Sequence, residues 1–167
     1  MRRSISMFFM VCIFLLGCSN FQENNIQRKE CAEKIITVML TAPNDKLYNI
    51  NVITIIGEGV ESTQENTDKQ TELIANWQNT VGDCFASDVL EESVRSGILT
   101  QYLGEAFITE ETLSLKNFEL KQAGEYTELY TVYWSLGNEN RCDDIFFRFN
   151  EDNLIEEIKI LSSVPAA

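Results

Sequence analysis

The sequence predicts an α+β domain in which N-terminal helices pack on a curved antiparallel meander of four strands. Apolar residues recur at helical spacing after residue 26, whereas from Leu113 onward they alternate with polar residues at the period of a strand. Short turn signals separate the alternating segments, so consecutive strands should pair in antiparallel fashion. Helices first and strands last is an order typical of helices that cover one face of a sheet.

The start of the chain carries a positive pair, an apolar run and a small residue before a cysteine. Arg2 and Arg3 precede the apolar stretch from Ile5 to Leu16, and Gly17 precedes Cys18. The run is shorter than the roughly 20 residues that cross a bilayer, and its length and flanks are those of an export signal. This segment resembles the lipobox signal peptide of bacterial lipoproteins. The alternative is an ordinary signal peptide in which the cysteine is a coincidence.

The lipobox resemblance implies an anchor and a location. Residues 1–17 are then the signal peptide, residues 18–25 the lipidated Cys18 and a short tether, residues 26–161 a single α+β domain, and residues 162–167 a C-terminal tail. A diacylglyceryl group on Cys18 supplies two acyl chains, which suffice for stable attachment. We therefore expect the protein on the extracytoplasmic face of the cell membrane, or on an outer membrane if the source has one.

The chain is strongly acidic and contains no histidine. It has 13 Lys and Arg against 26 Asp and Glu, a formal net charge of −13, and loss of Arg2 and Arg3 with the signal makes the remainder more negative still. Such a surface repels nucleic-acid phosphates and favours cationic partners by electrostatic steering. Without histidine, Ser-His and Cys-His nucleophile systems are excluded, and no cofactor is expected.

Three helices are predicted before residue 97. The first begins at Ile26 and ends near Thr41 because Pro43 cannot continue it, and its apolar face consists of Ala32, Ile35, Ile36, Met39 and Leu40. Thr67 and Gln70 form a capping box that opens the second, whose apolar face consists of Leu73, Ile74, Trp77, Val81 and Cys84. The third is short, from Val89 to Ser96, and ends at Gly97.

The sequence between the first two helices is less definite. Asn44 and Asp45 can cap a short helix through Tyr48. Residues 51–56 fit a strand, a helix or a buried loop, residues 57–59 break that element, and residues 61–67 are polar enough for an exposed loop.

Four strands are predicted in the last third of the chain. The apolar pairs Leu113/Leu115 and Phe118/Leu120 are out of phase, and one extra residue, a β-bulge near residues 116–117, reconciles them. After a turn at residues 124–125, one strand face consists of Tyr126, Tyr130, Val132, Trp134 and Leu136. Turns at residues 137–140 and 151–153 bound the next strand, whose inner face is Ile145, Phe147 and Phe149, and residues 154–161 complete the sheet.

This order of elements, with an acidic turn inside the segment from Ile145 to Ile158, resembles the nuclear transport factor 2-like superfamily of cone-shaped α+β domains. The resemblance covers residues 26–161 and implies a pocket between the curved sheet and the long helix. Steroid isomerases, dehydratases and domains that only bind share that fold, so the resemblance constrains shape more than function. A cystatin-like domain or another α+β sandwich is the structural alternative.

Three cysteines remain once Cys12 leaves with the signal and Cys18 takes the lipid. Three single bridges are possible, and Cys31 and Cys84 lie at or beside the apolar faces of their helices, which is compatible with a disulfide between them. The alternative is that Cys31, Cys84 and Cys142 are all small buried hydrophobes. No metal site is predicted, because the chain has neither histidine nor a CxxC spacing.

Aromatic residues are the candidate binding residues. If Trp77 faces the sheet, an apolar cavity is lined by Trp77, Tyr126, Tyr130, Trp134 and Phe147; the alternative is that these rings fill the core. For chemistry, Asp143 or Asp144 with Tyr130 would make a carboxylate–tyrosine pair. Both carboxylates follow a turn and are expected in solvent, so no catalytic residue is assigned.

The expected function is that of a membrane-anchored extracytoplasmic lipoprotein whose domain binds without catalysis. Its partner is a small molecule or an envelope protein, with cationic partners favoured. Two alternatives stay open: a histidine-free isomerase or dehydratase that uses the cone pocket, and a structural homodimer that pairs through the outer face of the sheet.

Overall fold

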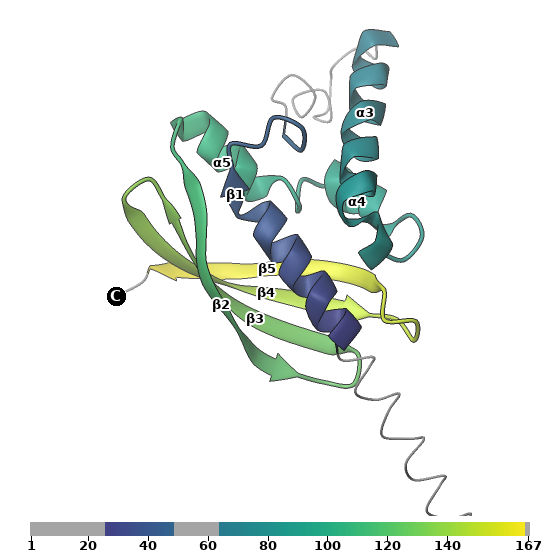
Figure 1. The fold of residues 1–167 in the computed structure, drawn as a ribbon, viewed down its shortest axis with the longest axis vertical. Helices are drawn as coiled ribbons and strands as arrows, with labels where there is room; N and C mark the ends of the chain where they lie inside the picture. The colour runs from purple at the N-terminus through teal and green to yellow at the C-terminus, as the bar shows by residue number, and fades with distance from the viewer. Residues whose placement is uncertain (1–25, 49–63, 166–167) are drawn as a thin grey trace, which may run out of the picture.

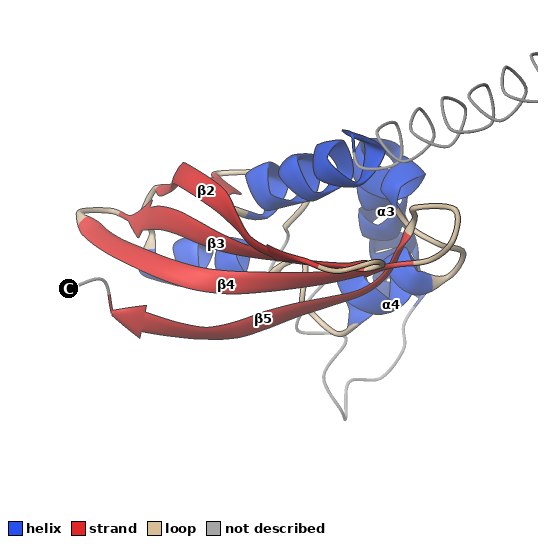
Figure 2. Cartoon of the chain, turned by 90° about the horizontal axis from the view of Figure 1, so that it is seen from below, coloured by secondary structure: helices blue, strands red, loops and turns tan. Residues whose placement is uncertain are grey.

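The structure is a computed structural model that describes residues 26–48 and 64–165 of the 167-residue chain. In this part, an antiparallel sheet curls around the helix over residues 26–39 (Figures 1 and 2). Helix α4 (Val89–Arg95) lies beside β5 (Ile155–Pro165), whereas α3 (Gln64–Val81) extends away from the sheet. The elements after the 26–39 helix are, in chain order, β1 (Thr41–Ala42), α3 (Gln64–Val81), a 3-10 turn (Gly82–Cys84), α4 (Val89–Arg95), α5 (Gln101–Thr109), β2 (Leu113–Ala123), β3 (Thr127–Leu136), β4 (Glu139–Phe149) and β5 (Ile155–Pro165).

The 26–39 helix forms because its apolar residues recur every three to four positions. The stripe predicted from the sequence is fully buried and comprises Ala32, Ile35, Ile36, Met39 and Leu40. The helix ends just before Thr41, as Pro43 requires. The prediction of a long first helix facing the sheet is therefore confirmed.

The strands follow the order β1-β2-β3-β4-β5, and each pairs antiparallel with its neighbour. The predicted bulge is confirmed, because the register between β2 and β3 shifts between Leu115 and Asn117 and leaves Lys116 as the extra residue. A second shift, between Leu120 and Gln122, has no counterpart in the prediction. Such irregularities bend and twist a strand, which helps the sheet to curl.

Two features of the sheet differ from the expectation. The sheet has five strands rather than four, because the two-residue β1 pairs with the start of β2 as the chain leaves the 26–39 helix. Strand β5 continues to Pro165 rather than ending at Leu161, because β4 offers it partners as far as Arg141. Residues 162–165 therefore belong to the sheet rather than to a tail.

The inner faces of β3 and β4 follow the predicted alternation. Their buried apolar side chains are Tyr130, Val132, Trp134, Leu136, Ile145, Phe147 and Phe149. Tyr126 is the exception, because it precedes β3 and lies partly in solvent. The Tyr130 and Phe147 rings meet edge to face with centroids 5.9 Å apart, a favourable geometry for aromatic packing.

Helices α3 and α4 lie near the predicted positions. Because Gln64 and Glu65 are good helix formers, α3 starts at Gln64, and the predicted capping box at Thr67 lies inside the helix. Helix α4 ends as predicted, since Gly97 follows it with a φ of 79°, the left-handed conformation that stops a helix.

The segment after β1 forms a turn rather than the predicted short helix. The amides of Leu47 and Tyr48 both donate to the Asn44 carbonyl. Helix α3 holds this turn, because Trp77 Nε1 donates to the Leu47 carbonyl at 3.0 Å. The predictions for residues 51–63, and the lipobox with Cys18, lie outside the described residues.

A disulfide joins the 26–39 helix to the 3-10 turn that follows α3. Cys31 and Cys84 are bonded, with their Cα atoms 5.3 Å apart, and both are buried. This is the pairing that the sequence left open beside unbridged thiols, and Cys142 carries a half-buried free thiol. Nearby, Lys34 Nζ lies 2.7 Å from Asp83 Oδ1, which adds a surface contact between the same two elements.

Removing this bridge should destabilise the fold. The two cysteines are 53 residues apart, and closing a loop of that length stabilises by about 4 kcal/mol in the chain-entropy model. The double variant Cys31→Ala/Cys84→Ala should therefore unfold at lower urea, and reductant should lower the midpoint of the wild type but not of the variant. Cys142→Ala is the matched control and should keep the reductant effect. A wild-type midpoint insensitive to reductant would contradict the bridge.

Candidate functional site

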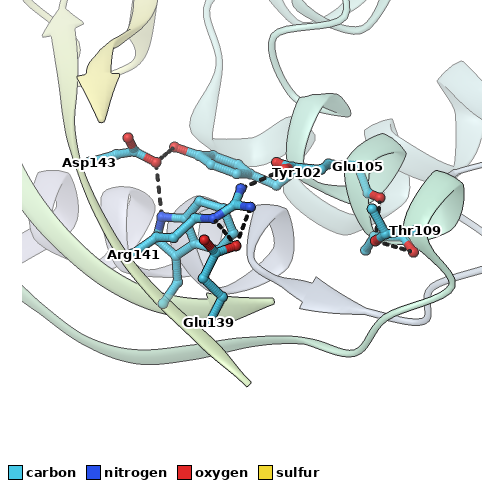
Figure 3. A network of polar contacts seen from close by, with 8 residues as sticks. Tyr102, Glu105, Thr109, Glu139, Arg141 and Asp143 are labelled. Carbon is cyan, nitrogen blue, oxygen red and sulfur yellow. Dashed lines mark hydrogen bonds and ion pairs between the residues drawn. The ribbon is translucent and has the colours of Figure 1, made fainter. Parts of the chain in front are cut away.

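A buried carboxylate lies on the inner face of β4. Asp143 is 4% exposed, and its Oδ2 accepts hydrogen bonds from Tyr102 Oη and Trp134 Nε1, each at 2.9 Å (Figure 3). Burial, and then the charge of Asp143, raise the pKa of Tyr102 well above its ordinary value. The phenol therefore stays protonated and remains a donor.

The expectation that Asp143 lies in solvent is wrong. Strand β4 already begins at Glu139, and alternation then turns residue 143 to the same side as the buried Ile145. Its neighbour Asp144 does face outward and pairs with Lys121 at 2.6 Å. The carboxylate–tyrosine pair therefore exists, but its tyrosine is Tyr102 from α5 rather than Tyr130.

Arg141 spans from β4 to α5 beside this buried group. Its Nη1 lies 2.5 Å from Glu105 Oε1 and its Nη2 lies 2.6 Å from Glu139 Oε2 (Figure 3). The guanidinium also stacks over the Trp134 ring, 5.2 Å from its centroid. These contacts fix α5 relative to β4, and a cation over an aromatic face is itself favourable.

A second buried carboxylate, Glu128, lies near the start of β3. Glu128 is 6% exposed and accepts a hydrogen bond from Tyr130 Oη at 2.7 Å. Burial raises the pKa of Glu128, opposed by that hydrogen bond and by the charge of Arg28. Arg28 is buried as well, and it donates to Asn153 Oδ1 at 2.6 Å and to the Glu125 carbonyl. The group ties the 26–39 helix to the β2–β3 and β4–β5 turns.

The aromatic residues predicted to line a cavity lie mostly in the core. Four of them are at most 2% exposed: Trp77, Tyr130, Trp134 and Phe147. Tyr126 is 37% exposed and borders a shallow groove beside Phe149 and the β4–β5 turn. The structure thus places these four rings as core-filling residues, and the larger cavity described next is lined by other side chains.

An open cleft of about 840 Å³ lies between α4, α5 and β5. One wall comes from α4, the following turn and α5, and the other from β5 and the adjoining part of β4. Apolar side chains contribute to both walls: Val89, Ile98, Ile108 and Ile158. Ile108 is 73% exposed, so it offers apolar surface that the rest of the described chain leaves largely uncovered.

Carboxylates dominate the charged lining of this cleft. The charged side chains that line the cleft are one arginine, Arg148, and four glutamates: Glu92, Glu105, Glu156 and Glu157. Arg148 lies 3.6 Å from Glu156 and 3.7 Å from Glu157. A hydrogen bond from Lys159 lowers the pKa of Glu157, which keeps that carboxylate ionised. Arg141 and Lys159 also pair with Glu105 and Glu157 from outside the lining, so the cleft combines an acidic, partly neutralised lining with apolar surface. Such a site can hold a cationic group attached to an apolar body.

This cleft is not predicted from the sequence, because helix α5, which forms part of one wall, is not predicted either. Thr100 provides no side-chain cap for α5, and Gly104 lies in its middle, so the usual helix signals are weak. The available signal is the spacing of the buried Tyr102, Leu103 and Ala106. Gly104 lets α5 pack closely on Tyr48, because a Cβ there would approach the Tyr48 ring to 3.1 Å and require the ring to shift.

The described residues contain neither a metal-ion cluster nor a helix that could span a membrane. In residues 26–48 and 64–165, no three His, Cys, Asp or Glu side chains are grouped to hold a metal ion. Among the helices of that same part, none is both long and apolar enough to cross a membrane. Comparison of the chain with protein-family models, curated proteins and solved structures finds no match.

The Asp143 group can be tested by a double-mutant cycle. Tyr102→Phe removes one hydrogen bond to a charged acceptor and should cost roughly 1.5–3 kcal/mol of unfolding free energy. In an Asp143→Ala background the Tyr102 hydroxyl is already unpaired, so the same change should cost little or even stabilise. Urea unfolding of the four proteins measures the coupling. Additive effects of the two substitutions would show that the pair does not interact.

Proposed function

We propose that this protein is a lipid-anchored extracytoplasmic binding protein that takes a cationic ligand or partner in the cleft between α4, α5 and β5. The cleft carries the proposal, since it is open, has a volume of about 840 Å³ and is lined by four glutamates against one arginine. Surface charge of one sign in a concave site raises the local concentration of opposite charges and speeds association. The acidity of the whole chain acts in the same direction.

The proposed anchor is the diacylglyceryl group on Cys18. The sequence before it supports this, and a net charge of −13 disfavours attachment of the protein surface to anionic lipid headgroups. Seven residues separate Cys18 from Ile26, and they span at most about 25 Å when extended. The domain, and the cleft with it, would therefore work close to the bilayer.

The proposed fold is the cone-shaped domain of the nuclear transport factor 2-like superfamily. A sheet that curls around a long first helix and a bulge in the first long strand support this assignment. Among the roles found on that fold, binding is favoured over catalysis here. The buried Asp143 is bonded to Tyr102 and Trp134, and none of the three residues lines the cleft.

Charge reversal in the cleft should weaken the binding of a polycation. We expect the full chain, purified in detergent, to bind spermine, and the double variant Glu92→Lys/Glu156→Lys to bind it about tenfold more weakly. Isothermal titration calorimetry at low and at raised salt measures both affinities, and salt should weaken the wild-type binding. The double variant Glu30→Lys/Glu72→Lys, at exposed residues of the 26–39 helix and α3 that do not line the cleft, is the charge-matched control. Equal losses in control and cleft variants would reject the site.

The anchor is testable independently of the cleft. Cells fed an alkyne-labelled fatty acid should incorporate label into the wild-type protein, because the lipobox directs acylation of Cys18. Cys18→Ser should abolish the label and leave a longer, uncleaved chain, whereas the control Cys12→Ser should keep it. Unlabelled wild-type protein would remove the lipoprotein assignment while leaving the cleft proposal in place.

A further inference from the structure

The acidic cleft is lined by side chains from both faces of strand β5. Glu157 and Ile158 are consecutive in β5, so their side chains point to opposite faces of the sheet. Both line the cleft, and so does Arg148, the residue paired with Glu157 on β4. A cavity that touches both faces of one strand must lie against its edge. The backbone of β5 therefore borders the cleft.

In the part of the chain that the structure describes, the far edge of β5 carries little pairing. The strand order ends at β5, which runs for 11 residues. At its start, Ile155 forms a parallel bridge to Phe85, and its carbonyl accepts a hydrogen bond from the Ala86 amide at 2.9 Å. That contact shows the edge already accepting another stretch of backbone. Beyond it, no strand of residues 26–48 and 64–165 pairs with β5 on that side, so its N–H and C=O groups offer a template for a further strand.

The two faces of β5 beside this edge suit one kind of strand. An added strand continues the sheet, so its side chains alternate between the face that carries Glu157 and the face that carries Ile158. Basic residues on the first face would meet Glu157, and apolar residues on the second would meet Ile158. Elsewhere in the cleft, Glu92 and the exposed Ile108 offer further contacts of both kinds. A polypeptide that alternates basic and apolar residues therefore matches both the charge and the pattern.

We infer that the partner is a protein that inserts an extended, alternating basic and apolar segment into the cleft, where it adds as a strand to β5. This inference rests on the proposed function and names the partner class and the binding mode for the same site. Main-chain hydrogen bonds to β5 supply affinity in this mode, and the side-chain contacts on alternate positions supply specificity. A polyamine can pair with the carboxylates of the cleft, but it has no peptide backbone with which to form main-chain hydrogen bonds to β5.

The experiment compares two peptides of identical composition. Each has alternating lysine and valine residues, and one is N-methylated on every lysine while the other is N-methylated on every valine. Since the amides of a strand alternate between its two edges, each modification blocks one edge only. Fluorescence anisotropy with the full chain in detergent should show one isomer binding as well as the unmethylated peptide. The other should bind more than about tenfold more weakly, having lost several main-chain hydrogen bonds.

A matched pair of variants separates side-chain contacts from charge. Ile108→Ser should weaken the binding of the peptide but not that of spermine. Leu120→Ser, a change of similar size at an exposed residue of β2 outside the cleft, should weaken the binding of neither. Equal binding of both methylated isomers would overturn strand addition and leave the cationic cleft intact, as would spermine binding without peptide binding. Self-association of the full chain that the unmethylated peptide competes would make a second copy the occupant of the β5 edge and overturn the inference. Failure of both spermine and peptide would remove the proposed function as well.

Discussion

The packing of the 26–39 helix against the inner face of the sheet is the interaction on which the rest of the structure depends. Its buried stripe meets the rings of β3 and β4, and each Å² of apolar surface removed from water contributes roughly 25 cal/mol. A sheet can enclose a helix only by curling, and the register shifts in β2 and between Arg148 and Phe149 allow the bend. The curl brings β5 to face α4, and the cleft lies in the angle between them.

Apolar burial has no direction, so polar groups at the two ends of the core determine how the helices sit. At one end, Arg28 connects the first helix to two strand turns. At the other, Asp143 and Arg141 connect α5 to β3 and β4. Buried polar groups of this kind are costly when any member is unpaired, which disfavours other placements of α5. Because α5 is one wall of the cleft and β4–β5 the other, the Asp143 and Arg141 contacts set the separation of the two walls.

The sequence predicts those parts of the fold in which buried apolar residues recur at the regular spacing of a helix or a strand. The stripe of the first helix and the phase change at Lys116 are of this kind, because apolar residues reveal an inward face directly. Asp143 is buried on the same alternation, but a carboxylate after a polar turn looks like a surface residue, so its pattern is hidden. The cleft is less predictable still. Its walls come from segments about fifty residues apart, 89–108 and 148–158, and no local pattern records that they meet.

The placement of the glutamates in the cleft is difficult to explain by folding alone. Acidic residues outnumber basic ones by 26 to 13, so the chain cannot give each carboxylate its own cation. A fold that only needed solubility would be more stable with the excess spread over its surface, since like charges close together repel. Here Glu156 and Glu157 share Arg148 and Glu92 borders the same concave space, whereas Glu105 is paired with Arg141 and Glu157 also with Lys159. A cationic partner would relieve that repulsion, and by linkage its binding would stabilise the folded state in proportion to the logarithm of its concentration over Kd. The proposed cationic partner would therefore meet carboxylates whose mutual repulsion its binding reduces.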